Sequence, residues 1–447
     1  MIPVPSPPQL APITAAPARA SAYKWWVVFL LWLVCFLNYA DRQAISSVLP
    51  LLEKAFHFDG VQLGLIGAAF AWVYAAFALV AGLLADRISR KTVILGACVV
   101  WSMFTLATAW CGSLAGFISV RALTGLGETF YIPAAMSLLS DYHGRNTRSR
   151  ALAWHQSAVY AGTVLGSWTA AVLAEKMGWQ FPFYLFGPLG FLLAAVLLTG
   201  VREPGRGAAD AADSAAAGVP HHGGGKSLSV RQTLTVIFRT PVALLLMAAF
   251  LLANFVAMII LTWMPTFLLK KFAFSLSGAG LSGTLYIQVA SAVMVPIAGW
   301  LADRWARRYA AGRMAVQATG LALGALFVFL VGATASAAVL IAAMMLFGAC
   351  KGFYDSGIFA ALYDTIEPRA RGTAAGIMNT VGWGGGALGP LCVGLAMKYG
   401  RREHDWQNMG DAIACCGAIY LVGAALVIAA AMLYTHRNAT RGKGTIA

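Results

Sequence analysis

Hydrophobic residues in this chain fall in long runs that short polar segments interrupt at nearly regular intervals. A helix rises about 1.5 Å per residue, so about 20 apolar residues cross the roughly 30 Å of hydrocarbon in a bilayer. The runs therefore predict membrane-spanning helices. In the first half these are expected near 24–49, 62–85, 92–111, 114–140, 149–174 and 181–200, and in the second near 241–268, 278–302, 314–333, 336–363, 371–397 and 411–435.

The spacing of the runs predicts an all-α integral membrane protein with twelve transmembrane helices in two six-helix bundles. The expected organisation is a disordered N-terminal tail (1–22), an N-terminal bundle (23–201), a flexible linker (202–240), a C-terminal bundle (241–436) and a C-terminal tail (437–447). The tail before the first run has no apolar core of the kind that a cleavable signal peptide requires.

The two halves repeat one another in sequence. The stretch from Gly82 to Lys91 recurs from Gly299 to Arg308, with glycine, aspartate and arginine in register. A second match begins at Glu128 in one half and at Lys351 in the other, and an aspartate follows each after thirteen residues. Two homologous halves, each with a charged loop between its second and third helices, are typical of carriers that work by alternating access.

The composition agrees with a bilayer protein, since 60% of the 447 residues are hydrophobic and only 11% are charged. The net charge of +15 follows the membrane topology, because most basic residues fall in the loops on one side. This distribution predicts that both termini and the linker are cytoplasmic, and it gives no support to nucleic acid as a partner. The seven cysteines have no metal-ligand spacing, so neither a metal nor a cofactor is expected.

Six ionisable residues fall inside the predicted helices, where a charge costs at least about 2.5 to 3.5 kcal/mol unless it meets a partner or a cavity. They are Asp41, Arg42, Arg121, Glu128, Lys351 and Asp355. One interpretation is a set of internal salt bridges, which suits Lys351 and Asp355 at i, i+4 spacing. The other is a binding site, since Asp41 can neutralise only one of the two arginines. Glu128 could be the missing partner or a proton carrier.

Neutral polar residues on the same helices are candidates for the wall of a central cavity. We expect substrate contacts from Tyr39, Tyr131, Gln156, Tyr354 and Asn379, beside Arg42 and Lys351. Charged residues near the loops are candidates for a gate, in which Asp141 would pair with Arg145 or Arg148, and Asp364 with Arg369 or Arg371. The full set of expected gating residues is Asp86, Arg87, Arg90, Asp141, Arg148, Asp303, Arg304, Asp364 and Arg371.

The segment from Gly82 to Lys91 resembles the signature loop of the major facilitator superfamily, and Arg121 to Gly127 resembles its fourth-helix motif. The segment Asn38 to Arg42, together with Arg121 and Glu128, is similar to the anion:cation symporters that import sugar acids and other organic anions. It also resembles the Spinster-type lipid carriers. The resemblance to the symporters implies that Arg42 binds a substrate carboxylate, that Asp41 and Glu128 take up protons, and that Arg121 tunes them. Ser89 departs from the glycine usual in the signature loop.

These observations favour proton-driven uptake of a small organic anion, by a protein that acts as a monomer in a cell membrane such as the bacterial inner membrane. The alternatives are a carrier of lysolipids or sphingoid molecules and a membrane sensor that binds solute without moving it. Sodium is the alternative coupling ion. Lys351 and Asp355 either bind substrate or pair only with each other. No phosphate loop or nucleophile motif indicates an enzyme.

Overall fold

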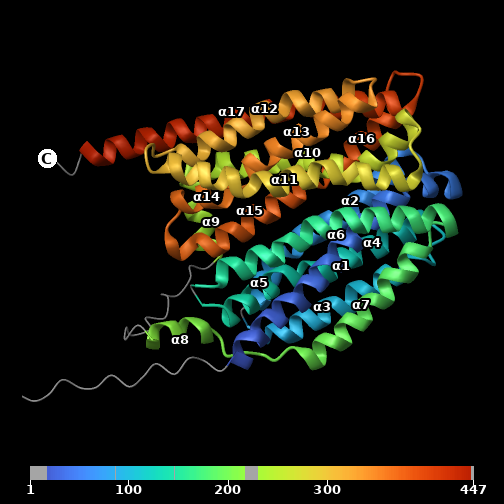
Figure 1. Cartoon of the computed structure of the whole chain (residues 1–447). Helices are drawn as coiled ribbons and strands as arrows, with labels where there is room; N and C mark the ends of the chain where they lie inside the picture. The colour runs from blue at the N-terminus through green and yellow to red at the C-terminus, as the bar shows by residue number, and fades with distance from the viewer. Residues whose placement is uncertain (1–17, 86, 145, 217–229, 444–447) are drawn as a thin grey trace, which may run out of the picture.

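The computed structural model describes residues 18–85, 87–144, 146–216 and 230–443 and is helical almost throughout (Figure 1). The N-terminal half contains α1 (Ala18–Phe56), α2 (Gly60–Ala85), α3 (Arg90–Thr108), α4 (Leu114–Thr129), α5 (Tyr131–Tyr142), α6 (Arg148–Met177) and α7 (Phe181–Gly200). The C-terminal half contains α10 (Pro241–Phe272), α11 (Leu276–Ala306), α12 (Gly312–Ala333), α13 (Ala337–Asp355), α14 (Ile358–Thr365), the short η1 (Pro368–Ala370), α15 (Arg371–Gly386), α16 (Leu388–Tyr399) and α17 (Asp405–Lys443).

The prediction of twelve membrane-spanning segments in two six-helix bundles is confirmed. Eleven helical segments of the described chain are long and apolar enough to cross a membrane. The remaining segment is formed by α4 and α5, which have 16 and 12 residues and carry Arg121, Glu128 and Asp141.

Three segments predicted as single helices, 114–140, 336–363 and 371–397, are each divided into two. Two of the divisions have the same cause. Pro133 and Pro390 lack the N–H that would bond to the carbonyl four residues earlier, and those carbonyls belong to Thr129 and Gly386, where α4 and α15 end. The third division lies at Ser356 and Gly357, between α13 and α14.

The segments outside the bundles differ from the flexible stretches expected of them. The linker contains two short helices, α8 (Ala208–Ala216) and α9 (Val230–Phe238), and α17 continues past residue 437 as far as Lys443. Of the predicted tail, Ala18 to Ala22 already belong to α1, and the rest lies outside the described residues.

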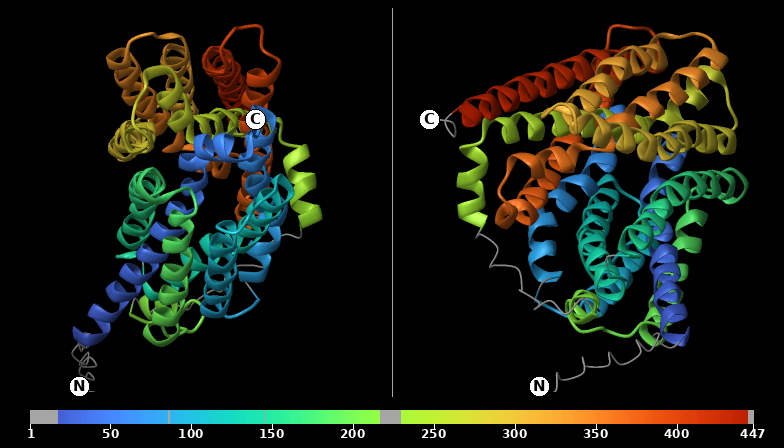
Figure 2. Two further views of the ribbon diagram at one scale, coloured as in Figure 1. Left: turned by 90° about the vertical axis from the view of Figure 1, so that its right-hand side faces the viewer. Right: turned by 60° about the vertical axis from the view of Figure 1, so that its left-hand side comes forward.

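The two bundles lie side by side, with the ends of the described chain and the linker helices at one end of the molecule (Figures 1 and 2). We call this the linker end and the other the far end. Between the halves, α2 packs on α15 and α16, α6 packs on α11, and α1 meets α10. Small residues permit these contacts: a Cβ added to Gly394 on α16 would lie 2.1 Å from the carbonyl oxygen of Gly60.

Glycines also set the packing inside the N-terminal half. A Cβ on Gly162 of α6 would lie 2.3 Å from the carbonyl oxygen of Phe36 on α1. One on Gly166 would lie 2.2 Å from the Cα of Ala40. Backbone atoms cannot yield in the way that flexible side chains do, so α1 and α6 can approach this closely only where glycine is present.

Substituting Gly166 by valine should therefore force α1 and α6 apart and destabilise the protein by about 1–3 kcal/mol, as is usual for overpacking. Gly96 on α3 is the matched control, because a Cβ there meets no atom within 4 Å. Thermal unfolding of the detergent-purified variants should show a lower Tm for Gly166→Val and an unchanged Tm for Gly96→Val. Equal values of Tm for the two variants would contradict the close contact.

Candidate substrate site

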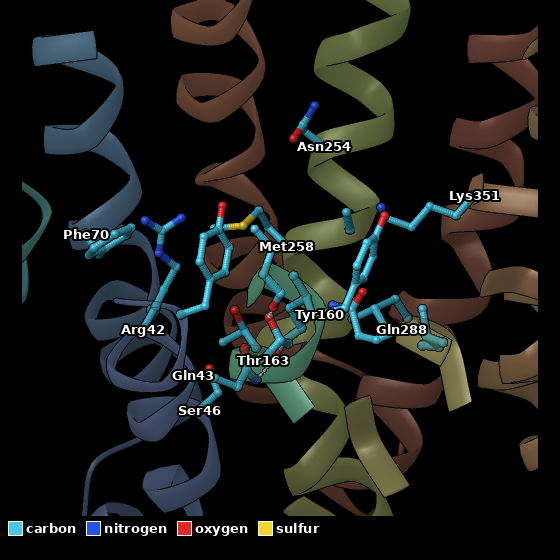
Figure 3. Close-up of a pocket in the computed structure, with 18 of the residues that line it drawn as sticks. Arg42, Gln43, Ser46, Phe70, Tyr160, Thr163, Asn254, Met258, Gln288 and Lys351 are labelled. Atoms are coloured by element: carbon cyan, nitrogen blue, oxygen red, sulfur yellow. Dashed lines mark hydrogen bonds between the residues drawn. The ribbon is translucent and has the colours of Figure 1, made fainter. Parts of the chain in front are cut away.

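A cavity of about 210 Å³ lies between the two bundles, near the middle of the spanning helices. Four helices of each half contribute to its wall: α1, α2, α4 and α6 from one, and α10, α11, α13 and α15 from the other. Arg42 and Phe70 lie on one side and Lys351 lies on the opposite side (Figure 3). The cavity is thus bounded equally by both halves of the sequence repeat.

Arg42 is held from behind the cavity wall by Glu128. Its Nη2 and Nε atoms donate to Oε2 of Glu128 at 2.8 and 3.0 Å, and Nη2 also donates to Asn38 Oδ1 at 3.3 Å. Glu128 is fully buried, whereas Arg42 lines the cavity. The expectation that Glu128 could be the missing partner of an arginine is therefore confirmed.

Aromatic rings surround the Arg42 guanidinium. Its Cζ lies 4.5 Å from the ring centre of Tyr39, 4.7 Å from Phe70, and 5.1 Å from both Tyr74 and Trp383. Trp383 reaches this cluster from the C-terminal half and lies against Tyr74, with ring centres 4.7 Å apart. Cation–π contacts stabilise a desolvated cation by about 2 kcal/mol or more, so the rings hold Arg42 charged while leaving its Nη1 without a hydrogen bond.

Arg121 is the cation of this site that lacks an ion pair within the described chain. It lines the cavity from α4, and its Cζ lies 4.9 Å from the ring centre of Phe70. Asp41 is not part of the wall: it is buried inside the N-terminal half, where it accepts a hydrogen bond of 3.4 Å from Thr105 Oγ1. A guanidinium that faces a cavity without a carboxylate partner is a suitable anchor for an anionic ligand.

Lys351 and Asp355 face the cavity from α13. They form an ion pair with each other, as their i, i+4 spacing predicted, and both also line the wall. Three cations (Arg42, Arg121, Lys351) and one carboxyl group (Asp355) thus line the cavity, and two further carboxyl groups (Asp41, Glu128) are buried behind its wall.

Four residues of the expected site take other positions. Tyr131 lies in the core of the N-terminal half, where its hydroxyl donates to the carbonyl of Leu31 at 2.7 Å and lies 2.9 Å from His155 Nε2. Tyr354 lies in the core of the other half. Asn379 is half-buried on α15 but is not in the cavity wall. These three residues and Asp41 therefore do not line the cavity.

Several wall residues were not among the candidates. Helical periodicity could have identified them, since cavity-lining residues follow i, i+3, i+4, i+7 spacing on each helix. On α1 the lining residues are Tyr39, Arg42, Gln43 and Ser46, of which Gln43 and Ser46 were not predicted. On α6 they are Gln156, Val159, Tyr160 and Thr163, of which only Gln156 was predicted, and on α10 they are Asn254, Ala257, Met258 and Leu261.

The charged loops at the linker end form ion pairs within their own halves. Asp141 accepts from Arg90 and from the N–H of Gly207, while Arg313 donates to Asp364 at 2.6 Å and to Asp303 at 2.9 Å. Asp141 and Asp364 each find an arginine 51 residues earlier in the chain. The two halves of the sequence repeat therefore form equivalent ion pairs, Arg90 with Asp141 and Arg313 with Asp364.

The predicted pairing of Asp141 with Arg148 and of Asp364 with Arg371 was wrong, and the alternative partner Arg145 lies outside the described residues. Arg148 bonds to Asp210 of α8 at 2.5 Å, and Arg371 donates to the carbonyl of Tyr363. In each half the arginine at the start of the third spanning helix comes closer to the aspartate than the arginine downstream. Arg87 and Arg304 are exposed, and Asp86 also lies outside the described residues.

Among the described residues, polar contacts between the two halves cluster toward the far end. Two are ion pairs, Glu53 with Lys270 at 2.6 Å and Asp59 with Lys398 at 2.8 Å. Three are hydrogen bonds: Ser277 N to Glu175 Oε2 at 2.9 Å, Ser167 Oγ to the carbonyl of Gly280 at 2.7 Å, and Gln43 Nε2 to the carbonyl of Leu261 at 2.7 Å. We call these five the far-end contacts.

The Asp59 contact is resistant to mild acid. Partial burial favours the neutral carboxyl, but the ammonium of Lys398 and the N–H of Gln62 stabilise the carboxylate and hold its pKa below the usual value. A lowered pKa means that the contact is complete above about pH 4 and is lost only as the pH falls further. The ion pair between Asp59 and Lys398 therefore does not depend on pH near neutrality.

A family model described as Major Facilitator Superfamily matches residues 31–390 and 290–445 of the chain. An ascorbate transporter of Arabidopsis thaliana chloroplasts is 28% identical over 422 residues, covering 90% of this chain and 75% of the relative. A probable galactarate/D-glucarate transporter of Bacillus subtilis is 27% identical, covering 87% and 88%. A 4-hydroxybenzoate transporter of Pseudomonas aeruginosa is 26% identical, covering 83% and 85%.

Solved structures share the fold at lower identity. A bacterial homologue of the human lysosomal transporter Spinster, in an inward-facing and unoccupied conformation, superposes with a TM-score of 0.78 at 19% identity, covering 93% of this chain and 98% of that one. A D-xylose–proton symporter superposes with a TM-score of 0.71 at 17% identity, covering 91% and 97%. The relatives and the fold are those of transporters, not enzymes.

The two tyrosines 131 and 160 offer a direct check of the site. Tyr131→Phe removes buried hydrogen bonds and should lower stability by about 1 kcal/mol, but it should leave the KM for transport unchanged because Tyr131 is outside the cavity. Tyr160→Phe changes a cavity-lining hydroxyl and should alter KM with little effect on Tm. The prediction fails if Tyr131→Phe changes KM more than Tyr160→Phe does.

Proposed function

Because the chain belongs to the major facilitator superfamily, we propose that this multi-pass membrane transporter is a proton-coupled symporter of small organic anions. The substrate class is a sugar acid or another small carboxylate, and transport proceeds by alternating access. The observation that carries the proposal is the cavity between the halves, which Arg42 and Arg121 both line and in which the Arg121 guanidinium forms no ion pair within the described residues.

The cations of the cavity account for anion recognition. A carboxylate placed between Arg42 and Arg121 would accept from donors that are already charged and desolvated, and charge-assisted hydrogen bonds of this kind are about twice as strong as neutral ones. Glu128 and the surrounding rings keep Arg42 in place before the substrate arrives, so little ordering is required on binding. Curated relatives named for galactarate/D-glucarate and 4-hydroxybenzoate, both carboxylates, agree with this substrate class.

The balance of charge accounts for proton coupling. When its three acids are ionised, the site is neutral, because three cations oppose them. A bound carboxylate adds one negative charge to a low-dielectric site, where an uncompensated charge costs several kcal/mol. Protonation of one of the three acids removes one negative charge from the protein, so the site with its bound carboxylate is neutral again. Asp41 and Glu128 are the proposed proton acceptors, Arg121 sets their charge environment, and Asp355 is available beside Lys351.

The size of the cavity favours a small solute. Sites for drug-sized ligands occupy about 300–1,000 Å³, whereas this cavity holds about 210 Å³. A sugar acid or a hydroxylated aromatic acid is compatible with such a volume. A lysolipid would require an opening for its acyl chain, so amphiphiles are kept as an outcome of the test below.

The distribution of contacts between the halves indicates the conformation. All five far-end contacts join one half to the other, whereas the charged loops of the described linker end pair within their own halves. The basic loops, both termini and the linker are assigned to the cytoplasm, so the far end faces the outside. We therefore assign the conformation as inward-facing, with the far end closed. We place the protein in a cell membrane, the inner membrane in a bacterium, acting as a monomer.

Ligand-dependent thermal shift of the purified protein tests the substrate class. Sugar acids, 4-hydroxybenzoate and small dicarboxylates should raise Tm, more strongly at acid pH than at neutral pH, and lysolipids or sphingoid bases should not. Arg42→Ala should weaken carboxylate binding by about ten- to a hundredfold, the loss expected for a charge-assisted contact of 1.5–3 kcal/mol. Stabilisation by amphiphiles alone would overturn the proposal.

Glu128→Gln tests proton coupling. The variant keeps an amide beside Arg42 but cannot cycle a proton, so exchange of labelled substrate across proteoliposomes should persist while accumulation driven by a pH gradient is lost. Asp355→Asn is the comparison for the second available acid. Accumulation by Glu128→Gln at the rate of the unaltered protein would remove Glu128 from the coupling mechanism.

A crosslink at the far end tests alternating access. Cysteines replacing Glu53 and Lys270 are expected to react with a short bifunctional reagent, because the native side chains approach within 2.6 Å. Joining them should stop transport, since the far end can no longer open, and cleavage of a reducible crosslinker should restore it. The control pair Lys270 and Asp405 lies within one half, so its crosslink should leave transport intact.

A further inference from the structure

One far-end contact lies at the wall of the cavity itself. Gln43 is 5% exposed, follows Arg42 on α1, and donates from Nε2 to the carbonyl oxygen of Leu261 on α10 at 2.7 Å. Both residues line the cavity, although they are 218 positions apart in the chain. Figure 3 shows Arg42, Gln43 and Ser46 along the same side of the site.

The Leu261 carbonyl needs a partner because of Pro265. In an α-helix the carbonyl of a residue accepts from the N–H four positions later, and proline has no N–H. Helix α10 nevertheless continues unbroken from Pro241 to Phe272 with Pro265 inside it. A carbonyl freed in this way must be satisfied by a side chain, water or a neighbouring helix when it lies at membrane depth.

Gln43 supplies the missing donor from the opposite half. Its amide comes from the residue next to the arginine that faces the substrate, so a displacement of α1 that follows binding acts directly on this hydrogen bond. When the halves separate at the far end, water entering the cavity can hydrate both the amide and the carbonyl. The bond therefore favours the closed far end without leaving a buried group unsatisfied in the open one.

We propose that Gln43 is a positioning residue that couples the substrate site to closure of the far end, by completing the hydrogen bond that Pro265 removes from α10. This inference rests on the alternating access of the proposed function, but not on the identity of the substrate or of the coupling ion. Ion pairs farther out hold the rim of the far end closed, whereas Gln43 holds the wall of the cavity.

The conformational equilibrium of the full-length protein, without substrate, gives the test. Spin labels at Lys176 and Arg401, which are exposed on the two halves at the far end, report separation by double electron–electron resonance once the exposed Cys392 and Cys415 are replaced by serine. Gln43→Met keeps the length of the side chain but removes the donor. It should shift the population toward the open far end by about fivefold, the worth of one typical hydrogen bond.

A second substitution separates this role from general packing. Pro265→Ala returns an N–H to α10 and gives the Leu261 carbonyl its own helical partner, so in that background Gln43→Met should change the population by less than about twofold. Gln156→Met is the matched control, because Gln156 lines the same cavity from α6 and has no hydrogen bond to the other half among the described contacts. It should leave the distance distribution unchanged.

The outcomes separate this inference from the proposed function. An equal shift in the native and Pro265→Ala backgrounds, or no shift in Gln43→Met, would overturn it. If Pro265→Ala fails to fold, Gln43→Asn is the second test. The shorter amide cannot reach the Leu261 carbonyl, so this variant should show the same population shift as Gln43→Met. A distance distribution like that of the unaltered protein would overturn the coupling. If Pro265→Ala suppresses the population shift of Gln43→Met in a protein that binds no carboxylate, the coupling role of Gln43 is supported and the anion symporter is rejected.

Discussion

The compensation of charge inside a low-dielectric bundle is the constraint on which the rest of this molecule depends. Arg42 can stay ionised within the helical bundle because Glu128 accepts two of its hydrogen bonds and four rings surround its guanidinium. Removing either partner would leave a buried charge that costs several kcal/mol. The same constraint makes the site responsive, since any charge that enters it must be matched by another.

The interface between the halves is built to be closed at one end without being permanent. Glycines bring α2 and α16 into backbone contact, while the far-end contacts add a few polar interactions that water can replace when the halves separate. Their number is small enough that neither state is stabilised excessively. A substrate shifts such an equilibrium only by its difference in affinity between the two states, so weak and hydrated contacts suit a carrier.

Prolines give the helices their functional irregularities. Pro133 and Pro390 divide α4–α5 and α15–α16, whereas Pro265 leaves α10 continuous and exposes one carbonyl to the other half. At Leu261 a glutamine from α1 is within reach, and the helix keeps its course. Proline therefore divides a helix at some positions of this chain and leaves it continuous at others.

The sequence by itself determined the membrane-spanning fold, the two-half repeat and the six charged residues within the helices, because hydrophobic run length, loop charge and repeat register are all local properties of the chain. It also predicted the Lys351–Asp355 pair, since four residues on one helix bring side chains together. Only the tertiary structure decided that Asp141 meets Arg90, that Tyr131 belongs to the core, and that Gln43 reaches Leu261. Those contacts join residues on different helices, and the rotation of each helix about its axis, which sets the direction of a side chain, depends on the packing of all its neighbours.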